Sequence, residues 1–370
     1  MLRFSFRLSI GFSFFTIFVF SILAQDAVKF VDKTKKGESE LNGLITGDSV
    51  KGLLIKIQKD PNPKLIPAVD IINVTYSSTA IGSIELKSAL GKEIRANLPS
   101  TKEADKVKLY EESIKDISEL LPKLKSDMRL SKYLNFRIAK VKADLAKIKP
   151  EALPDAIKAL NIVRIDNPDS WMTLGSFKIE AELQEIKGNF DAALKLYQGM
   201  GKLPGVPKEI KTDSDFLILK LLMRTNRMAE AESKLKEVES VILEGDPRRS
   251  QVLLVKTQAN LLNNQLNSIE VDLNKVIDLS DETFTRSKAF NLLGEFYLKK
   301  NKDAEAFWAF LIVDTIYNQD TDEHAKALYH LSILFDKVKN DPIRARQSRD
   351  KLLDPIYLKS EYQNKVSADK

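Results

Sequence analysis

The feature that most constrains this chain is a helical pattern that returns at a nearly constant spacing between residues 156 and 345. The spacing is measured between equivalent positions, here called the repeat positions, early in the second helix of each predicted helix pair. They are Ala156, Ala193, Ala231, Ile269, Ala306 and Ala345, so the position number rises by 37, 38, 38, 37 and 39 from each to the next. Units this short cannot each bury a core, so they must stack into an array whose core is continuous.

The clearest unit covers residues 290–318. Its large and small apolar side chains recur at helical spacing on either side of a turn at Asn301. They are Phe290, Leu293, Gly294, Tyr297, Ala306, Phe310 and Val313. We expect Gly294 and Ala306 to face each other so that two helices cross closely. Two earlier units follow the same scheme, with turns at Gly188 and Asn226.

This unit resembles a tetratricopeptide repeat, whose pattern is W-x2-L-G-x2-Y, a turn glycine and A-x3-F. Phe290 replaces the tryptophan and Asn301 the glycine. The other units are degenerate, with Gln184 and Leu222 in place of the tyrosine. The resemblance implies an α-solenoid, a superhelix of helix pairs whose concave surface binds peptides or proteins.

The whole chain also resembles a group of exported planctomycete repeat proteins of unassigned activity. The stretches LPGVPKEI, LLMR and VDTIYNQDTDEHAKALYHLS carry this resemblance, together with the order of a leader, a small β unit and helical repeats. The resemblance implies no catalytic residues.

A small β module precedes the helices. Residues 27–76 hold short alternating apolar runs separated by Gly, Pro, Asn and Asp, which predict four or five strands. A strand break is expected at residues 47–49 and one helical turn at residues 67–70. This pattern favours an SH3-like or Sm-like barrel, either a cap on the repeats or a binding module. We therefore divide the chain into a β module at 25–78, a linker at 79–101 and helical repeats at 102–370.

Residues 1–24 have the pattern of a secretory signal peptide. Arg3 and Arg7 precede an uncharged run at 8–23, and Ala24-Gln25 follows as a cleavage point. The run is short for a membrane span, which needs about 20 residues. We expect export to the periplasm or cell envelope, with an uncleaved N-terminal anchor as the alternative.

The composition excludes several kinds of chemistry. The chain has no cysteine, which removes disulfides, thiolate metal sites, a thiol nucleophile and lipid attachment at cysteine. His324 and His330 are six residues apart, about 240° around a helix, so one helix face cannot present both to a metal. The glycines of residues 199–205 follow a helix and are expected to form an inter-repeat turn. We assign no catalytic, cofactor-binding or metal-binding residue, and we expect no enzyme activity and no cofactor.

Basic residues concentrate at residues 121–150. Nine Lys or Arg, at positions 123, 125, 129, 132, 137, 140, 142, 147 and 149, stand against two aspartates. They predict a solvated helix face or, alternatively, a docking face for anionic lipid, cell-wall polymer or an acidic protein. Aromatic residues are scarce in this segment, which argues against single-stranded nucleic acid. The aromatic cluster of Phe307, Trp308 and Phe310 is expected to lie mostly in the core.

Together these patterns predict an exported protein–protein interaction scaffold. Its partner is expected to be a protein or peptide rather than a nucleic acid, held on the concave face between residues 102 and 357. The alternative is a component of cell-envelope assembly or cell division, associated with the membrane or cell wall.

The leader gives a direct prediction. The native mature protein should begin at Gln25 and be found outside the cytoplasm, because the charged start and apolar run end at Ala24. N-terminal sequencing of protein from the native source checks this. A membrane-bound form that retains Met1 would support the anchor alternative instead.

Overall fold

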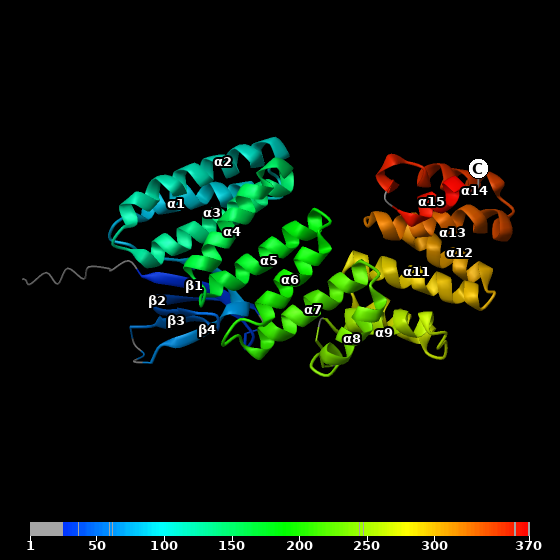
Figure 1. Ribbon diagram of the computed structural model, residues 1–370, viewed down its shortest axis with the longest axis horizontal. Helices are drawn as coiled ribbons and strands as arrows, with labels where there is room; N and C mark the ends of the chain where they lie inside the picture. The colour runs from blue at the N-terminus through cyan, green and yellow to red at the C-terminus, as the bar shows by residue number, and fades with distance from the viewer. Residues whose placement is uncertain are drawn as a thin grey trace, which may run out of the picture.

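The protein consists of a small β-sheet at one end and a row of helix pairs that leads away from it (Figure 1). This description rests on a computed structural model and covers residues 25–368 except 36, 59, 61, 244, 247 and 359. The predicted leader at 1–24 lies outside the described residues. The predicted fold class, a helical solenoid preceded by a β module, is confirmed.

The β module is a five-stranded antiparallel sheet in the order β4-β3-β2-β1-β5. Its elements are β1 (Asp26–Asp32), β2 (Gly37–Ser49), β3 (Gly52–Lys56), β4 (Lys64–Pro67), the 3-10 turn η1 (Ala68–Asp70) and β5 (Ile71–Thr75). Both the strand number and the helical turn agree with the sequence prediction. The predicted break at residues 47–49 is wrong, because these residues belong to β2, whose register shifts between Ile45 and Gly47 and which ends at the turn of Val50-Lys51. Bulges bend a strand without ending it.

Fifteen helices follow among the described residues, mostly as antiparallel pairs. The first six are α1 (Ser83–Ala96), α2 (Glu103–Leu120), α3 (Met128–Ile148), α4 (Leu153–Asp166), α5 (Trp171–Ile186) and α6 (Phe190–Gly201). The next five are α7 (Lys208–Arg224), α8 (Met228–Glu239), α9 (Arg249–Leu262), α10 (Ile269–Leu279) and α11 (Thr283–Lys299). The last four are α12 (Asp303–Thr315), α13 (Thr321–Lys339), α14 (Pro342–Leu352) and α15 (Glu361–Ala368). Short 3-10 turns lie at η2 (Leu121–Leu124), η3 (Pro150–Ala152) and η4 (Pro355–Tyr357).

The turn inside each later pair contains one residue with left-handed backbone. These residues are Gly188, Asn226, Asn264, Asn301 and Asn340, with φ between 52° and 80°. Glycine and asparagine tolerate this conformation best. Each lies five residues before a repeat position. In four turns, the next backbone N–H bonds to a carbonyl five residues back at 2.8–2.9 Å, the bond that closes a Schellman motif.

The repeat positions are buried, as the spacing predicts. Five have no exposed surface, and Ala345 is 7% exposed. Ile269 occupies the equivalent place although it is not small. The predicted partner of Gly294 needs correction, since the ring of Phe310 lies against it. A Cβ built at Gly294 would approach that ring to 2.5 Å.

The linker predicted at 79–101 is wrong. Most of it forms α1, which packs on α2 as the first helix pair of the array. The Ser, Gly and Thr content suggested a connection, but Leu86, Ala89, Glu93 and Ala96 recur on one buried side of the helix. Tertiary burial of this stripe overrides the weak local preference.

The basic residues of α3 fix the β module to the helices. Arg129 donates to the buried Asp26 carboxylate at 3.1 Å and to the Ile45 carbonyl at 2.9 Å. Arg137 bonds the carboxylate of Glu93 in α1 and, at 3.2 Å, the side chain of Asn73 in β5. The sheet, α1 and α3 therefore share one polar network.

A second set of contacts completes this attachment. The Tyr133 hydroxyl donates to the Val74 carbonyl at 2.7 Å and accepts from Arg137 at 2.8 Å. Burial raises the pKa of Tyr133, so the phenol remains protonated as a donor. Apolar side chains of the sheet and of α1–α4 form one core around these bonds.

Replacing Gly294 by alanine should destabilise the fold by about 1–3 kcal/mol, because the new methyl group would displace the Phe310 ring. The matched control is Gly91→Ala in α1, where nothing lies within 4 Å of the added Cβ. That change should be neutral or stabilise by up to about 1 kcal/mol. Urea unfolding of both variants measures the difference. Equal unfolding midpoints would contradict the close packing of α11 on α12.

Candidate functional site

The first helices of the later pairs, α5, α7, α9, α11 and α13, form a surface that we call the inner face. Ion pairs connect these helices across unit boundaries. They are Arg224–Glu185 at 3.5 Å, Lys220–Glu282 at 2.6 Å and Lys326–Glu295 at 2.5 Å. Burial acts to raise the pKa of Glu282, but hydrogen bonds from Lys220 and Thr285 outweigh it and lower that pKa. Two of the pairs join neighbouring units, and the Lys220–Glu282 pair joins α7 to the residue that precedes α11, two units further on.

A buried polar cluster lies where α11 meets α13. Glu323 approaches the Lys288 ammonium at 3.5 Å and accepts from the Asn291 amide at 2.7 Å. All three side chains are buried. Burial acts to raise the pKa of Glu323, whereas Lys288 and Lys326 act to lower it, and the net effect is a lowered pKa. Glu323 is therefore ionised at neutral pH and holds two helices together.

The β module contacts the inner face at a junction that we call the seam. The β2–β3 turn places Val50 in an apolar cluster with Leu174, Met200 and Ile210. Beside it, Asp48 accepts from the Ser170 hydroxyl at 2.7 Å and from the Trp171 backbone N–H at 3.2 Å. Asp48 thus contacts the first turn of α5 and ties the β2–β3 hairpin to that helix.

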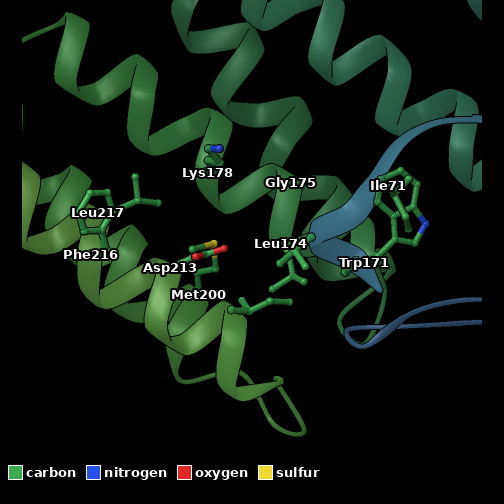
Figure 2. A pocket seen from close by; sticks show the side chains of 12 residues that line it. Ile71, Trp171, Leu174, Gly175, Lys178, Met200, Asp213, Phe216 and Leu217 are labelled. Atoms are coloured by element: carbon green, nitrogen blue, oxygen red, sulfur yellow. The ribbon is translucent and has the colours of Figure 1, made fainter. Parts of the chain in front are cut away.

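A pocket of about 360 Å³ opens at the seam (Figure 2). It lies between the segment around η1 and helices α5, α6 and α7. Its lining is mainly apolar: Ala68, Val69, Ile71, Trp171, Leu174, Gly175, Met200, Ile210, Phe216 and Leu217. Lys178 and Asp213 are its two charged residues. A concave apolar site with few polar groups is the usual form of a binding pocket.

The two charges differ in their surroundings. Asp213 forms an ion pair with Arg248, whose guanidinium also lies over the Phe216 ring at 5.7 Å. Burial raises the pKa of Asp213, while the charges of Arg248 and Lys178 oppose the shift. Lys178 has no ion pair or hydrogen bond with any described residue, although it lies close enough to influence Asp213 and Glu182 electrostatically. Its ammonium is available to an anionic or carbonyl group.

The sequence-predicted histidines are structural. His330 stacks on the Phe310 ring at 4.3 Å between α12 and α13, and burial lowers its pKa to about 3. His324 lies in the first turn of α13, where its ring nitrogens contact Asp314 at 2.7 Å and the Tyr357 hydroxyl at 2.8 Å. The two rings thus pack in separate places.

The predicted inter-repeat turn at residues 199–205 and the aromatic cluster at residues 307–310 can also be compared with the structure. Gly199 and Gly201 end α6, and residues 202–207 form the expected turn between units. Phe307 and Phe310 are buried as expected, whereas Trp308 is 54% exposed with Lys339 over its ring at 4.7 Å.

The basic segment at 121–150 is neither a plain solvated face nor a free docking face. Six of its nine basic residues form ion pairs within the chain. The pairs are Lys123–Glu85, Arg129–Asp26, Arg137–Glu93, Lys140–Glu93, Lys147–Asp144 and Lys149–Glu111. Much of the charge is therefore already balanced inside the molecule.

Sequence reasoning missed the seam pocket. Trp171 and Phe216 follow the helical pattern and give no separate signal, and the contacts of the β2–β3 hairpin with the start of α5 join residues more than 120 positions apart. Within residues 25–368, apart from the six omitted positions, no cluster of three metal-ligating side chains is found. In the same described part of the chain, no helix has the length and apolarity to span a membrane.

Comparison with known proteins gives structural likenesses alone. No family model and no curated protein matches the chain. The solved structure of PilW, a widely conserved type IV pilus biogenesis factor, is 16% identical, covers 62% of this chain and 98% of its own, and has a TM-score of 0.42. A tetratricopeptide repeat protein from Parabacteroides merdae is 13% identical. The match covers 72% of this chain and 92% of that protein, with a TM-score of 0.47. A chain of the APC/C hetero-tetramer Cut9–Hcn1 is 13% identical. The match covers 78% of this chain and 55% of that one, with a TM-score of 0.46.

The array shows a helix-pair repeat in its own geometry. Paired helices, left-handed turns and buried repeat positions recur at one spacing from α5 to α14. The resemblance of residues 290–318 to a tetratricopeptide repeat is therefore matched by the fold.

Glu323→Gln should destabilise the protein by about 3 kcal/mol at pH 7, because it leaves the Lys288 ammonium buried without its counter-charge. The folded-state pKa of Glu323 is lowered from 4.5, so its stabilisation is present above that value and is lost as the pH falls through the folded pKa. The difference in the free energy of unfolding between wild type and variant should therefore become smaller from pH 7 to pH 3. Urea unfolding across this range checks it.

The control is Glu305→Gln, which removes a half-exposed ion pair of 3.9 Å with Lys302. It should change stability by less than about 1 kcal/mol. A Glu323→Gln effect as small as the control, or one that grows toward low pH, would contradict the assigned role.

Proposed function

We propose that this chain is an exported protein–protein interaction scaffold that holds a partner segment along its inner face. The seam pocket is the observation that carries the proposal. It is concave, mainly apolar and open, and it lies where the inner face meets the β module. Binding energy in protein interfaces concentrates in a few apolar side chains that fill such pockets.

The pocket defines how a partner segment would be held. Its volume of about 360 Å³ matches one or two bulky apolar side chains. Lys178, which lacks an ion pair with any described residue, is placed to bond a carboxylate or backbone carbonyl next to the inserted side chain. An extended or helical peptide with an apolar residue beside an acidic one is the chemistry that fits.

The β module contributes to binding in this proposal. Ala68, Val69 and Ile71 form one wall of the pocket, so neither the helices nor the sheet would bind alone. Cutting the chain near residue 101 would also separate α1 from α3, which share the Glu93–Arg137 pair. The function is therefore to be tested in the intact mature chain.

Export rests on the leader pattern of residues 1–24. We infer a non-catalytic role in the periplasm or cell envelope, with a protein or peptide partner and no nucleic acid. The alternative is a component of cell-envelope assembly or cell division, associated with membrane or cell wall. It would be favoured if the partner recovered through the pocket were an envelope-assembly or division protein.

Two variants test the pocket. Leu217→Trp should fill it, and Lys178→Glu should repel an acidic group at its edge. Each should reduce recovery of the partner at least about tenfold in cross-linking pull-downs from the native envelope fraction, because a lost apolar anchor or a reversed charge is worth about 1.4 kcal/mol or more. Thermal melts verify that the variants remain folded.

The matched control is Lys195→Glu on α6, an exposed lysine outside the pocket that has no ion pair with any described residue. It makes the same charge change and should leave recovery intact. If all three variants recover the same partners as wild type, the pocket is not the binding site.

A further inference from the structure

The outward side of α4 carries an aliphatic groove that shares no residue with the seam pocket. Two isoleucines that line it are exposed, Ile162 at 44% and Ile165 at 76%. The groove is lined by Leu153, Pro154, Ile157, Lys158, Asn161, Ile162, Ile165 and Lys187. Exposed isoleucines gathered along one groove, rather than scattered, mark an interaction surface.

The repeat itself shows that this surface is unusual. Ile162 and Ile165 lie six and nine residues after the repeat position Ala156. In the five later units, the residues six and nine places after the repeat position are mostly polar or small. The pairs are Gly199/Lys202, Glu237/Ser240, Lys275/Asp278, Ile312/Thr315 and Lys351/Asp354. Only α4 places an isoleucine at both positions. Packing does not require this, because the inward side of α4 is already filled by buried Ala156, Leu160 and Val163.

The groove is rigidly supported. Arg164, on α4, bonds the Glu180 carboxylate of α5, and its guanidinium lies over the Phe177 ring at 4.8 Å. These contacts join α4 to α5 through the residue that precedes Ile165. A preformed surface of this kind binds without first having to order itself.

The two charged residues that line the groove are both lysines. Lys158 and Lys187 line it, are exposed, and have no ion pair with any described residue. Nearby Arg164 is already paired with Glu180. An occupant therefore needs an aliphatic face and negative charge beside it.

We infer that this groove binds an acidic amphipathic helix of a second partner protein. From Pro154 to Ile165 the groove follows α4 for about 16 Å, the length of three helical turns. Aliphatic residues at i, i+3 or i+4, and i+7 of a helix would contact Ile162 and Ile165, a recurring mode of peptide recognition. Glutamates at the sides of that stripe would face Lys158 and Lys187.

This inference goes beyond the proposed function. The seam pocket lies between the β module and helices α5–α7, whereas the groove lies along α4 and shares no lining residue with that pocket. A chain with both would connect two partners. The groove variants leave the seam untouched, so failure of one proposal is distinguishable from failure of the other.

Synthetic stapled helical peptides of about four turns serve as probes, with binding to the full mature chain measured by fluorescence anisotropy. One peptide carries a leucine stripe with flanking glutamates, and the second has the same stripe with flanking lysines. We expect the glutamate peptide to bind wild type at least tenfold more tightly than the lysine peptide. Ile165→Ser should weaken the glutamate peptide about tenfold. Lys158→Glu combined with Lys187→Glu should reverse the preference.

The matched control is Ile343→Ser, which removes an isoleucine that is 71% exposed on α14. It should change binding less than twofold. Equal affinity of both peptides for wild type, or equal affinity of wild type and Ile165→Ser, overturns the inference. So does a dimer in sedimentation analysis that Ile165→Ser dissolves, since the occupant would then be a second copy. Binding of phosphatidylglycerol vesicles that depends on Ile165 overturns it in favour of a lipid surface.

Discussion

The ion pair between Arg137 and Glu93 is the contact on which the arrangement of this molecule depends. Both side chains are more than 90% buried, and the pair joins α3 to α1. Removing one partner of such a pair leaves a buried charge without compensation. Through Asn73 and Tyr133 the same guanidinium also reaches β5, so one side chain positions two helices and the sheet.

The seam pocket depends on this attachment of the sheet to α1 and α3. Because α3 and α1 hold the sheet at a fixed angle, the β2–β3 turn reaches α5, and Val50 enters the cluster with Leu174 and Met200. The η1 segment then stands beside α5 and α7 and closes one side of the pocket. Helix pairs alone would give an inner face without this enclosed corner. The β module therefore has a specific part in forming the binding surface.

Much of the fold could be predicted from local sequence. The repeat positions and the turns at Gly188, Asn226 and Asn301 were visible because helical periodicity and left-handed turns depend on nearby residues. Asn264 and Asn340 offered the same signal, five residues before Ile269 and Ala345, and Asn264 would have supported the unit of Ile269, whose repeat position is not small. Helix α1 was missed because its Ser and Gly content concealed a short apolar stripe.

The pocket and the role of the basic segment could not be predicted in this way. Nothing near Arg137 in sequence indicates that its partner is Glu93, 44 residues earlier, or that Asp48 meets Ser170, 122 residues later. A run of lysines and arginines has the same pattern whether it faces solvent or is paired inside the fold. These features depend on how the elements pack, which composition and spacing do not encode.

The most direct test of this account follows the seam during unfolding. The chain has two tryptophans, so in a Trp308→Phe background the fluorescence of Trp171, which packs edge-on against Phe136 of α3, reports the seam alone. We predict that Arg137→Met shifts its urea midpoint well below that of the parent. The control Lys142→Met, a basic residue of the same helix that has no ion pair with any described residue, should not shift it. An unchanged Trp171 midpoint in Arg137→Met would show that the seam forms independently of the α3 network and would contradict the account.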